Sequence, residues 1–243
     1  RLVCGSAELD PAGQCSGLRT LAAEGGTVAD ITLIRRSPEH ANWLSCICED
    51  WQILAFAPEW IRSDREAVHA AVRQSWRALQ FASEELQVDR EMGLLAVRQD
   101  WSALEFLHKA LRSNRDVVWA ALKQDPAALE LADQELKADK ATVLYAVQQQ
   151  GSMLRVAAPE LRRDREVVGE AVRRSGSALQ YADEELRADR DTVLAAVRQN
   201  GLALKYASHG MKADVSVVLA ATKENLYAIE LAAWDLQMAL GVM

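Results

Sequence analysis

The sequence is poor in the residues that hold small proteins together through disulfides or metals. Among 243 residues there are four cysteines, Cys4, Cys15, Cys46 and Cys48, and all of them precede residue 50. A disulfide framework therefore does not hold most of the chain together. Cys46 and Cys48 are two residues apart, so on a helix they point in nearly opposite directions and make a poor metal site. We expect no metal and no cofactor.

The chain also lacks long apolar runs and an excess of positive charge. No stretch reaches the roughly 20 apolar residues of a spanning helix, so no membrane span is predicted. The formal net charge of -7 and the sequence pI near 5.2 make unselective nucleic-acid binding unlikely. Half of the residues are hydrophobic, which is typical of a soluble, well-buried protein. No ordinary signal peptide is predicted, and we expect an intracellular location, in the cytoplasm or in an organelle.

Motifs for catalysis are missing as well. Gly25-Gly26 lacks the Lys-Ser/Thr of a phosphate-binding loop, and no G-x-S-x-G sequence occurs. The four histidines, His40, His69, His108 and His209, fall at four different repeat positions and form no ladder of ligands. An enzyme with its site in residues 1–38 is a weak alternative, because that segment is too short to build a pocket unaided. No catalytic residue is predicted.

What the chain does have is a strict period of 25 residues. Seven capping residues mark it: Asp64, Asp89, Asn114, Asp139, Asp164, Asp189 and Asp214. Each starts a similar phrase, and such repetition indicates an array in which every unit buries its apolar face against the next.

Each repeat shows two helical patterns. After the capping residue, apolar side chains such as Val68, Ala71 and Val72 recur with helical spacing, which predicts a helix over about residues 65–74. A second capping residue follows eleven positions after the first, and a second helix and a short turn are predicted there. Two apolar ridges should run through the array, Leu54, Leu79, Leu104, Leu129, Leu154, Leu179, Leu204 and Ile229, and Ile61, Leu86, Leu111, Leu136, Leu161, Leu186, Met211 and Leu236.

These patterns predict an all-α fold, an α-solenoid of about eight 25-residue helix-turn-helix repeats over residues 39–238. Residues 1–38 lie outside the repeat, and we expect an irregular N-terminal cap with a short strand at Thr27–Ile34. Residues 239–243 are a C-terminal tail.

The repeated phrase D-R-x-x-V-x-x-A-V-x-Q-x-G-x-A-L-x-x-A-x-E-E-L-x-x-D resembles the repeat family DUF4116, a domain of unknown function. Asp164 to Asp189 follows it except for Arg174, and Asp189 to Asp214 follows it except at His209, Gly210 and Met211. The resemblance covers about four-fifths of the chain and implies a helical repeat, found mainly in protists. It implies no activity and no catalytic residue.

Two classes of function fit such an array. The first is a non-catalytic scaffold for protein partners, with the extended surface of a solenoid, which includes a structural subunit of a larger assembly or an accessory subunit peripherally associated with an organellar membrane complex. The second is single-stranded RNA binding with one base per repeat. Its phosphate contacts would be Arg73, Arg98, Lys123, Arg173, Arg198 and Lys223, and its stacking rings Phe81, Phe106, Tyr181 and Tyr206. The acidic balance favours the scaffold.

The candidate partner-binding residues are three tryptophans. Trp51, Trp76 and Trp101 share one repeat position at the start of the second helix, where Gly151, Gly176 and Gly201 stand in later repeats. Either the three rings stack on one another as packing, or they form a row that anchors a protein partner, since tryptophan is enriched in binding hot spots.

Overall fold

The computed structural model describes residues 2–4, 7–9 and 37–239. The chain divides into two compact blocks, residues 1–87 and residues 88–243, and each is described by itself. We number the repeats 1 to 8, from residues 39–63 to residues 214–238. The N-terminal block therefore holds repeats 1 and 2, and the C-terminal block holds repeats 3 to 8.

Every repeat except repeat 5 contains three helical elements and not two. In repeat 6 a ten-residue α-helix, α12 (Arg165–Arg174), precedes a 3-10 helix, η5 (Gly176–Tyr181), and a short α-helix, α13 (Glu184–Arg187). The second predicted helix is thus a 3-10 helix, and the predicted turn after it contains a further turn of α-helix. Extended residues, Ser175 and Ala182, bound η5 and leave six residues, a length that suits i to i+3 hydrogen bonding.

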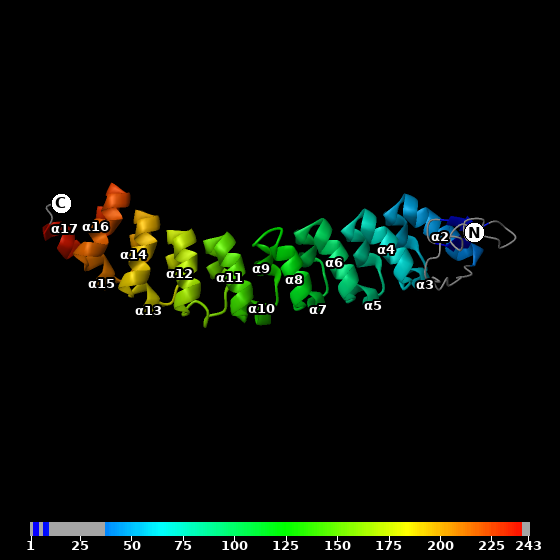
Figure 1. Ribbon diagram of the computed structural model, residues 1–243, viewed down its shortest axis with the longest axis horizontal. Coiled ribbons are helices and arrows are strands. Elements are labelled where there is room, and N and C mark those ends of the chain that lie inside the picture. Colours follow the sequence, from blue (N-terminus) through cyan, green and yellow to red (C-terminus); the bar gives the residue numbers. More distant parts are fainter. Residues whose placement is uncertain (1, 5–6, 10–36, 240–243) are drawn as a thin grey trace, which may run out of the picture. The chain divides into compact units, whose positions relative to one another are not determined.

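The same order recurs along the array (Figure 1). The long helices are α2 (Pro38–Glu49), α4 (Arg65–Gln74), α6 (Arg90–Gln99), α8 (Arg115–Leu122), α11 (Lys140–Gln149), α12, α14 (Arg190–Gln199) and α16 (Val215–Glu224). The 3-10 helices are η1 (Trp51–Phe56), η2 (Trp76–Phe81), η3 (Trp101–Glu105), η4 (Gly151–Val156), η5, η6 (Gly201–Tyr206) and η7 (Leu226–Leu231), and repeat 4 has α9 (Ala128–Leu131) in their place. The short helices are α3 (Glu59–Arg62), α5 (Glu84–Gln87), α7 (Lys109–Arg112), α10 (Gln134–Ala138), α13, α15 (His209–Ala213) and α17 (Trp234–Ala239), and repeat 5 has a turn there.

The short strand predicted in the N-terminal segment stays a prediction. Thr27–Ile34 lies outside the described residues. The described residues form strands near the start of the chain, where β1 (Leu2–Cys4) and β2 (Ala7–Leu9) pair antiparallel with Leu2 opposite Leu9. Each is three residues long, too short for the alternation of apolar and polar residues to show in the sequence.

The capping residues are confirmed at all seven positions. Asp164, for example, accepts hydrogen bonds from the amides of Glu166 and Val167 at 2.9 and 3.1 Å, which satisfies donors that the first helical turn leaves free. Most of these caps also pair with the preceding repeat. Lys140 Nζ lies 2.8 Å from Asp164, and Arg165 lies 2.6 Å from Asp189. In repeat 1, His40 takes this place, with its Nε2 at 2.8 Å from Asp64.

The two apolar ridges form the core. The first ridge is buried up to Leu204 in repeat 7 and the second up to Leu186 in repeat 6, whereas Met211, Ile229 and Leu236 are only half-buried. One position of the long helix holds a small residue in seven successive repeats, and all seven alanines are fully buried: Ala71, Ala96, Ala121, Ala146, Ala171, Ala196 and Ala221. A small side chain there lets the helices approach closely.

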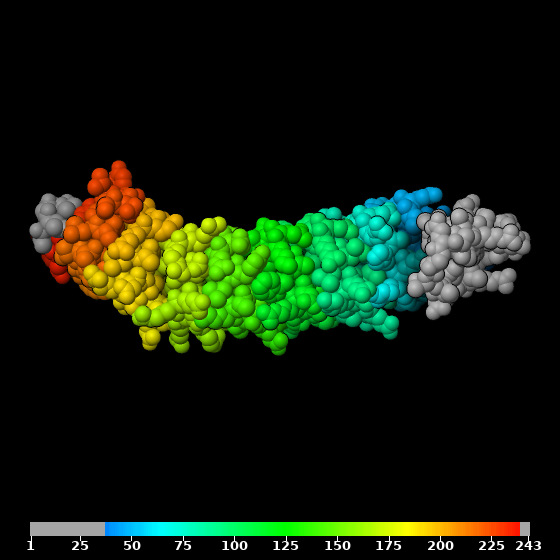
Figure 2. Space-filling model, viewed as in Figure 1, coloured from blue at the N-terminus to red at the C-terminus, as the bar shows by residue number. Residues whose placement is uncertain are grey.

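Within the C-terminal block, successive repeats pack side by side (Figures 1 and 2). Helix α12 packs between α11 and α14, and α14 packs against α16, while the 3-10 helices η4 to η7 contact one another in order. Backbone hydrogen bonds join the repeats as well, since the amide of Asp183 donates to the carbonyl of Arg162 and that of Ser208 to the carbonyl of Arg187. These residues therefore fold as an α-solenoid.

Two polar positions that the sequence reading left without a role support this packing. Gln199 at the end of α14 accepts a hydrogen bond from the amide of Gly176 in the preceding repeat, and Gln74 donates to the carbonyl of Ile47 at 2.6 Å. Lys137 donates to the carbonyl of Glu130 at 2.8 Å, at the end of α9. Long polar side chains thus satisfy backbone amides and carbonyls that helix ends leave free.

Candidate partner-binding surface

Trp51 joins two successive repeats of the N-terminal block. It is the first residue of η1 and is half-buried. Its ring stacks on that of Phe81, the last residue of η2, with the ring centroids 6.4 Å apart and the planes inclined by 28°. Part of the Trp51 ring therefore packs between 3-10 helices, and part stays open to solvent.

The other two tryptophans differ from Trp51 in burial or in surroundings. Trp76 is 8% exposed, and the guanidinium of Arg77 lies over its ring at 4.6 Å from the centroid, so packing accounts for most of its surface. Trp101 belongs to the C-terminal block, is half-buried and donates its backbone amide to Gln124 Oε1 at 3.1 Å. That the three rings anchor a partner as one row stays a prediction.

Two exposed aromatic residues near Trp51 were missed by the sequence reading. Phe56, at the end of η1, is 84% exposed, and Trp60 in α3 is 45% exposed. The Trp60 ring is tilted against that of His40, with centroids 5.8 Å apart. The available signal was local density, because Trp51, Phe56 and Trp60 fall within ten residues of a chain that is 6% aromatic. We call Trp51, Phe56, Trp60 and Phe81 the aromatic cluster.

Two members of the aromatic cluster, Phe56 and Trp60, leave large apolar rings exposed. The nearest charged pair in sequence, Arg62 and Glu59, is closed on itself at 2.8 Å. Large rings that stay exposed beside neutralised charge lose water on contact with a partner and bury a large apolar area for little conformational entropy. Such a surface suits an apolar or aromatic side chain of another protein.

Glycine stands at the tryptophan position in later repeats because a larger side chain does not fit there. A Cβ atom built on Gly151, Gly176 or Gly201 would lie 2.4, 2.4 or 2.3 Å from the carbonyl oxygen of Ala171, Ala196 or Ala221 in the next repeat. Contacts that short force the backbone to shift. In these repeats the long helix of the following repeat therefore packs directly on the start of the 3-10 helix, and no side chain fits between them.

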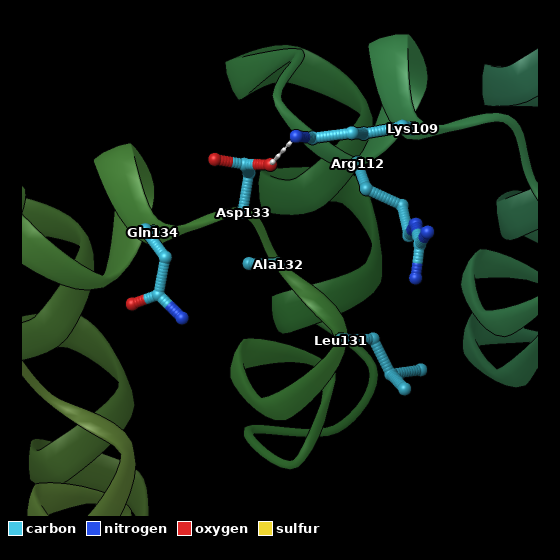
Figure 3. A pocket seen from close by; sticks show the side chains of 6 residues that line it. All are labelled: Lys109, Arg112, Leu131, Ala132, Asp133 and Gln134. Carbon is cyan, nitrogen blue, oxygen red and sulfur yellow. Dashed lines mark ion pairs between the residues drawn. The ribbon is translucent and has the colours of Figure 1, made fainter.

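Shallow hollows recur along the C-terminal block. One of about 140 Å³ lies between α7 and α10, where Lys109 points toward Asp133 at 3.8 Å beside Arg112 (Figure 3). Another of about 250 Å³ lies fifty residues further on, lined by Arg162, Asp183 and Arg187 among others. Nε of Arg112 and of Arg187 is buried without a hydrogen-bond partner. Because both hollows occupy the same repeat position, they follow from how neighbouring repeats meet.

The described residues show no group of three or more His, Cys, Asp or Glu side chains placed to hold a metal ion. Cys46 is half-buried, as expected, whereas Cys48 is exposed on α2. No helix in the described part of the chain is both long enough and apolar enough to cross a membrane.

The fold, the repeat and its contacts define a class, the helical-repeat proteins built from 25-residue units. The family model for the domain of unknown function DUF4116 matches seven overlapping segments, residues 43–87, 64–112, 89–137, 114–162, 139–187, 164–212 and 189–237. The chain belongs to this family. No match to this chain was found among the curated proteins or among the solved structures.

Proposed function

We propose that this chain is a non-catalytic scaffold that binds a protein partner through the aromatic cluster of its N-terminal block. The observation that carries the proposal is the exposure of Phe56 and Trp60, at 84% and 45%, in the same repeat as the half-buried Trp51. Binding energy at protein interfaces concentrates in a few large side chains, with tryptophan prominent among them. Within the N-terminal block the two repeats are joined by packing of α2 on α4 and of η1 on η2, and by a hydrogen bond from the amide of Ser83 to the carbonyl of Arg62, which gives this cluster a stiff support.

Burial divides the predicted tryptophan residues between two roles. Trp51 has surface left for a partner, whereas Trp76, at 8% exposure, has little. The partner-binding role therefore belongs with Trp51 and the missed residues Phe56 and Trp60. The proposal includes the case in which this scaffold is an accessory subunit of an organellar membrane complex.

A double substitution tests the proposal without disturbing the core. In Phe56→Gln/Trp60→Gln both changes are at exposed positions, so helix content and the urea midpoint should stay within the range of surface substitutions, about 0.5 kcal/mol. Capture of partner proteins from a native extract should fall at least about tenfold. The matched control is Leu202→Gln, an exposed apolar residue of η6 at 42% exposure, which should capture as the unaltered chain does. Equal capture by the double variant and the control would refute the proposal.

RNA binding is the second candidate, and one observation favours it. The basic residues that end the long helices, Arg73, Arg98, Lys123, Arg173, Arg198 and Lys223, are all exposed. A filter-binding titration with single-stranded RNA at low salt separates the candidates, because phosphate contacts lose affinity steeply as salt is added. The scaffold proposal expects no retention of RNA at any salt concentration.

A further inference from the structure

Repeats 6 to 8 carry an excess of positive charge at the corner where each long helix passes into a 3-10 helix. In repeat 6 this corner is residues 173–177, at the end of α12 and the start of η5, and its counterparts are residues 198–202 and 223–227. These three corners, which we call the basic corners, hold four cations and one carboxylate. The corresponding corners of repeats 3 to 5 carry no net charge, and they are residues 98–102, 123–127 and 148–152.

The excess arises because the residue that caps the 3-10 helix is neutral in the later repeats. In repeats 3 and 4 the caps are Asp100 and Asp125, which place a carboxylate two residues after the basic residue. In repeats 7 and 8, Asn200 and Asn225 accept the same kind of hydrogen bond at 3.0 Å. The cap is therefore made without a charge, and the cation that complements the dipole of the long helix gains no carboxylate from it.

The cations of the basic corners are exposed, and most of their charge is not compensated within the chain. Arg173 pairs with Glu170 of its own helix, α12. Among the described residues, Arg174, Arg198 and Lys223 have no carboxylate within the distance of an ion pair. Exposed cations without a partner keep a positive potential on this edge of the array.

Cations at the opposite ends of the same helices are used differently. Arg165 at the start of α12 lies 2.6 Å from Asp189, and Arg190 at the start of α14 lies 3.5 Å from Asp214. These ion pairs join neighbouring repeats, so their charge is compensated inside the chain. The charge of the basic corners has no such role and is open to a partner.

The basic corners form a row with a definite spacing. Helices α12, α14 and α16 pack side by side in that order (Figure 1). Because packed helices lie about 8–10 Å apart, one cation recurs at about this interval along Arg173, Arg198 and Lys223. A polyproline II segment has three residues per turn and rises about 3.1 Å per residue, so every third side chain lies on one face, about 9 Å from the last.

Other regular conformations fit this interval less well. On one face of a β-strand, side chains recur every second residue, at about 6.6 Å. On an α-helix, seven residues bring a side chain back to the same face after about 10.5 Å. The polyproline II period is the one that falls within the spacing of the row.

We propose that the basic corners bind an acidic protein segment in the polyproline II conformation, with a carboxylate at every third residue. Successive carboxylates meet Arg173, Arg198 and Lys223, and Arg174 adds a second guanidinium at the first corner. This site goes beyond the aromatic cluster, because it lies in the other block and recognises charge.

Single-stranded RNA is the competing anion, and the structure favours the acidic segment. Proteins that bind single strands combine cations with aromatic rings on which the bases stack. Tyr181, one of the candidate rings, lines a hollow together with Asp183 and Glu184, whose carboxylates repel phosphate. The ring of Tyr206 already carries Lys205, with Nζ 5.6 Å from its centroid. The basic corners therefore offer cations without open stacking rings.

Fluorescence anisotropy with two labelled peptides of one composition tests the proposal on the full chain. The first peptide repeats Glu-Pro-Pro five times, and the second carries the five glutamates in one block followed by ten prolines. At low salt the first should bind on the order of tenfold more tightly, because only its carboxylates match the row, and added salt should weaken it. Equal binding of the two peptides, or binding of neither, overturns the proposal.

Substitution of two cations locates the site. Arg198→Gln/Lys223→Gln removes exposed, unpaired charge and should weaken binding of the first peptide on the order of tenfold, with helix content unchanged. The matched control, Arg165→Gln/Arg190→Gln, removes the same charge from the ion-paired ends of the helices and should bind as the unaltered chain does. Equal weakening in both variants would show that net charge alone decides binding, and overturns the proposal.

Two further measurements keep this site apart from the other candidates. Phe56→Gln/Trp60→Gln should bind the first peptide as the unaltered chain does, whatever becomes of the aromatic cluster as a binding surface. Weaker binding by that variant would place the site in the other block and overturn the proposal. A single-stranded RNA of fifteen nucleotides should not bind at the same salt concentration. RNA binding that Arg198→Gln/Lys223→Gln abolishes overturns the acidic segment as the occupant.

Discussion

Repeats 1 to 3 and repeats 5 to 7 follow one plan but differ in the residue that begins the 3-10 helix. The 3-10 helix begins with tryptophan in the first group, Trp51, Trp76 and Trp101, and with glycine in the second, Gly151, Gly176 and Gly201. At the glycines the next long helix packs directly on the backbone. At Trp51 a ring takes part of the contact and reaches solvent. This position therefore either brings neighbouring repeats into direct backbone contact, as at the glycines, or holds an aromatic ring that reaches solvent, as at Trp51.

The largest effect that sharpens this comparison comes from deletions in the glycine repeats. Removing one whole repeat, residues 164–188, places α14 where α12 packs, so the chain should unfold cooperatively at a lower urea midpoint. Removing only residues 164–175 joins a 3-10 helix to the turn of repeat 5 and destroys the alternation of elements. Far-ultraviolet circular dichroism during urea unfolding should show a cooperative transition for the first deletion only. Equal loss in both would mean that the 25-residue repeat is not the structural unit.

Within the tryptophan group, burial predicts unequal costs. Trp76→Gly removes a side chain that is 8% exposed and should lower the free energy of unfolding by about 3–5 kcal/mol. Trp51→Gly removes a half-buried ring and should cost clearly less. Urea unfolding of the two single variants measures both values. A larger loss for Trp51 than for Trp76 would show that the exposed part of Trp51 does not reflect its role.

Glycine at the same position should resist even the smallest side chain. Gly176→Ala places a Cβ 2.4 Å from the carbonyl of Ala196 and should lower the free energy of unfolding by about 1–3 kcal/mol. The control is Gly169→Ala on α12, where nothing lies within 4 Å of the added Cβ, and alanine should stabilise the helix by about 0.5–1 kcal/mol. Two changes of the same sign would show that space does not decide this position.

The smallest effect concerns the charges between glycine repeats. Hydrogen bonds from Thr192, together with Arg165, lower the pKa of Asp189 despite partial burial. A lowered carboxyl pKa in the folded state adds stability that is complete above the unfolded pKa, near 4, and is lost as the pH falls through the folded value. Unfolding free energy should therefore fall below about pH 4, and less so in Asp189→Asn, which keeps a capping oxygen as Asn114 does. An equal decline in both chains would show that Asp189 does not contribute to this pH dependence of stability.

Much of the fold could be predicted from the sequence because the period of 25 residues places capping and apolar residues at the same positions of successive repeats. The caps from Asp64 to Asp214 and the buried alanines, Ala71 among them, follow from helix physics and were predicted in place. The 3-10 helices were not, since a six-residue segment gives too short a pattern to tell i+3 from i+4 hydrogen bonding. The hydrogen bonds of Gln199, which accepts, and of Lys137, which donates, were missed because their partners are backbone atoms, which leave no trace in the side-chain pattern.

The candidate surface could be predicted only in part. Shared repeat position singled out Trp51, Trp76 and Trp101, but position alone does not separate the half-buried Trp51 from the buried Trp76. Phe56 and Trp60 stand out only once their exposure is known.

Partner capture by two altered chains is the most direct test of the central claim. That claim is that the aromatic cluster binds the partner and that the glycine repeats only support the cluster. The first lacks repeat 6, residues 164–188, and the second carries Phe56→Gln/Trp60→Gln. Quantitative capture from the same native extract should be retained by the first and lost by the second, although the first is the less stable protein. Loss of capture in the repeat deletion with full capture by the double variant would contradict the account.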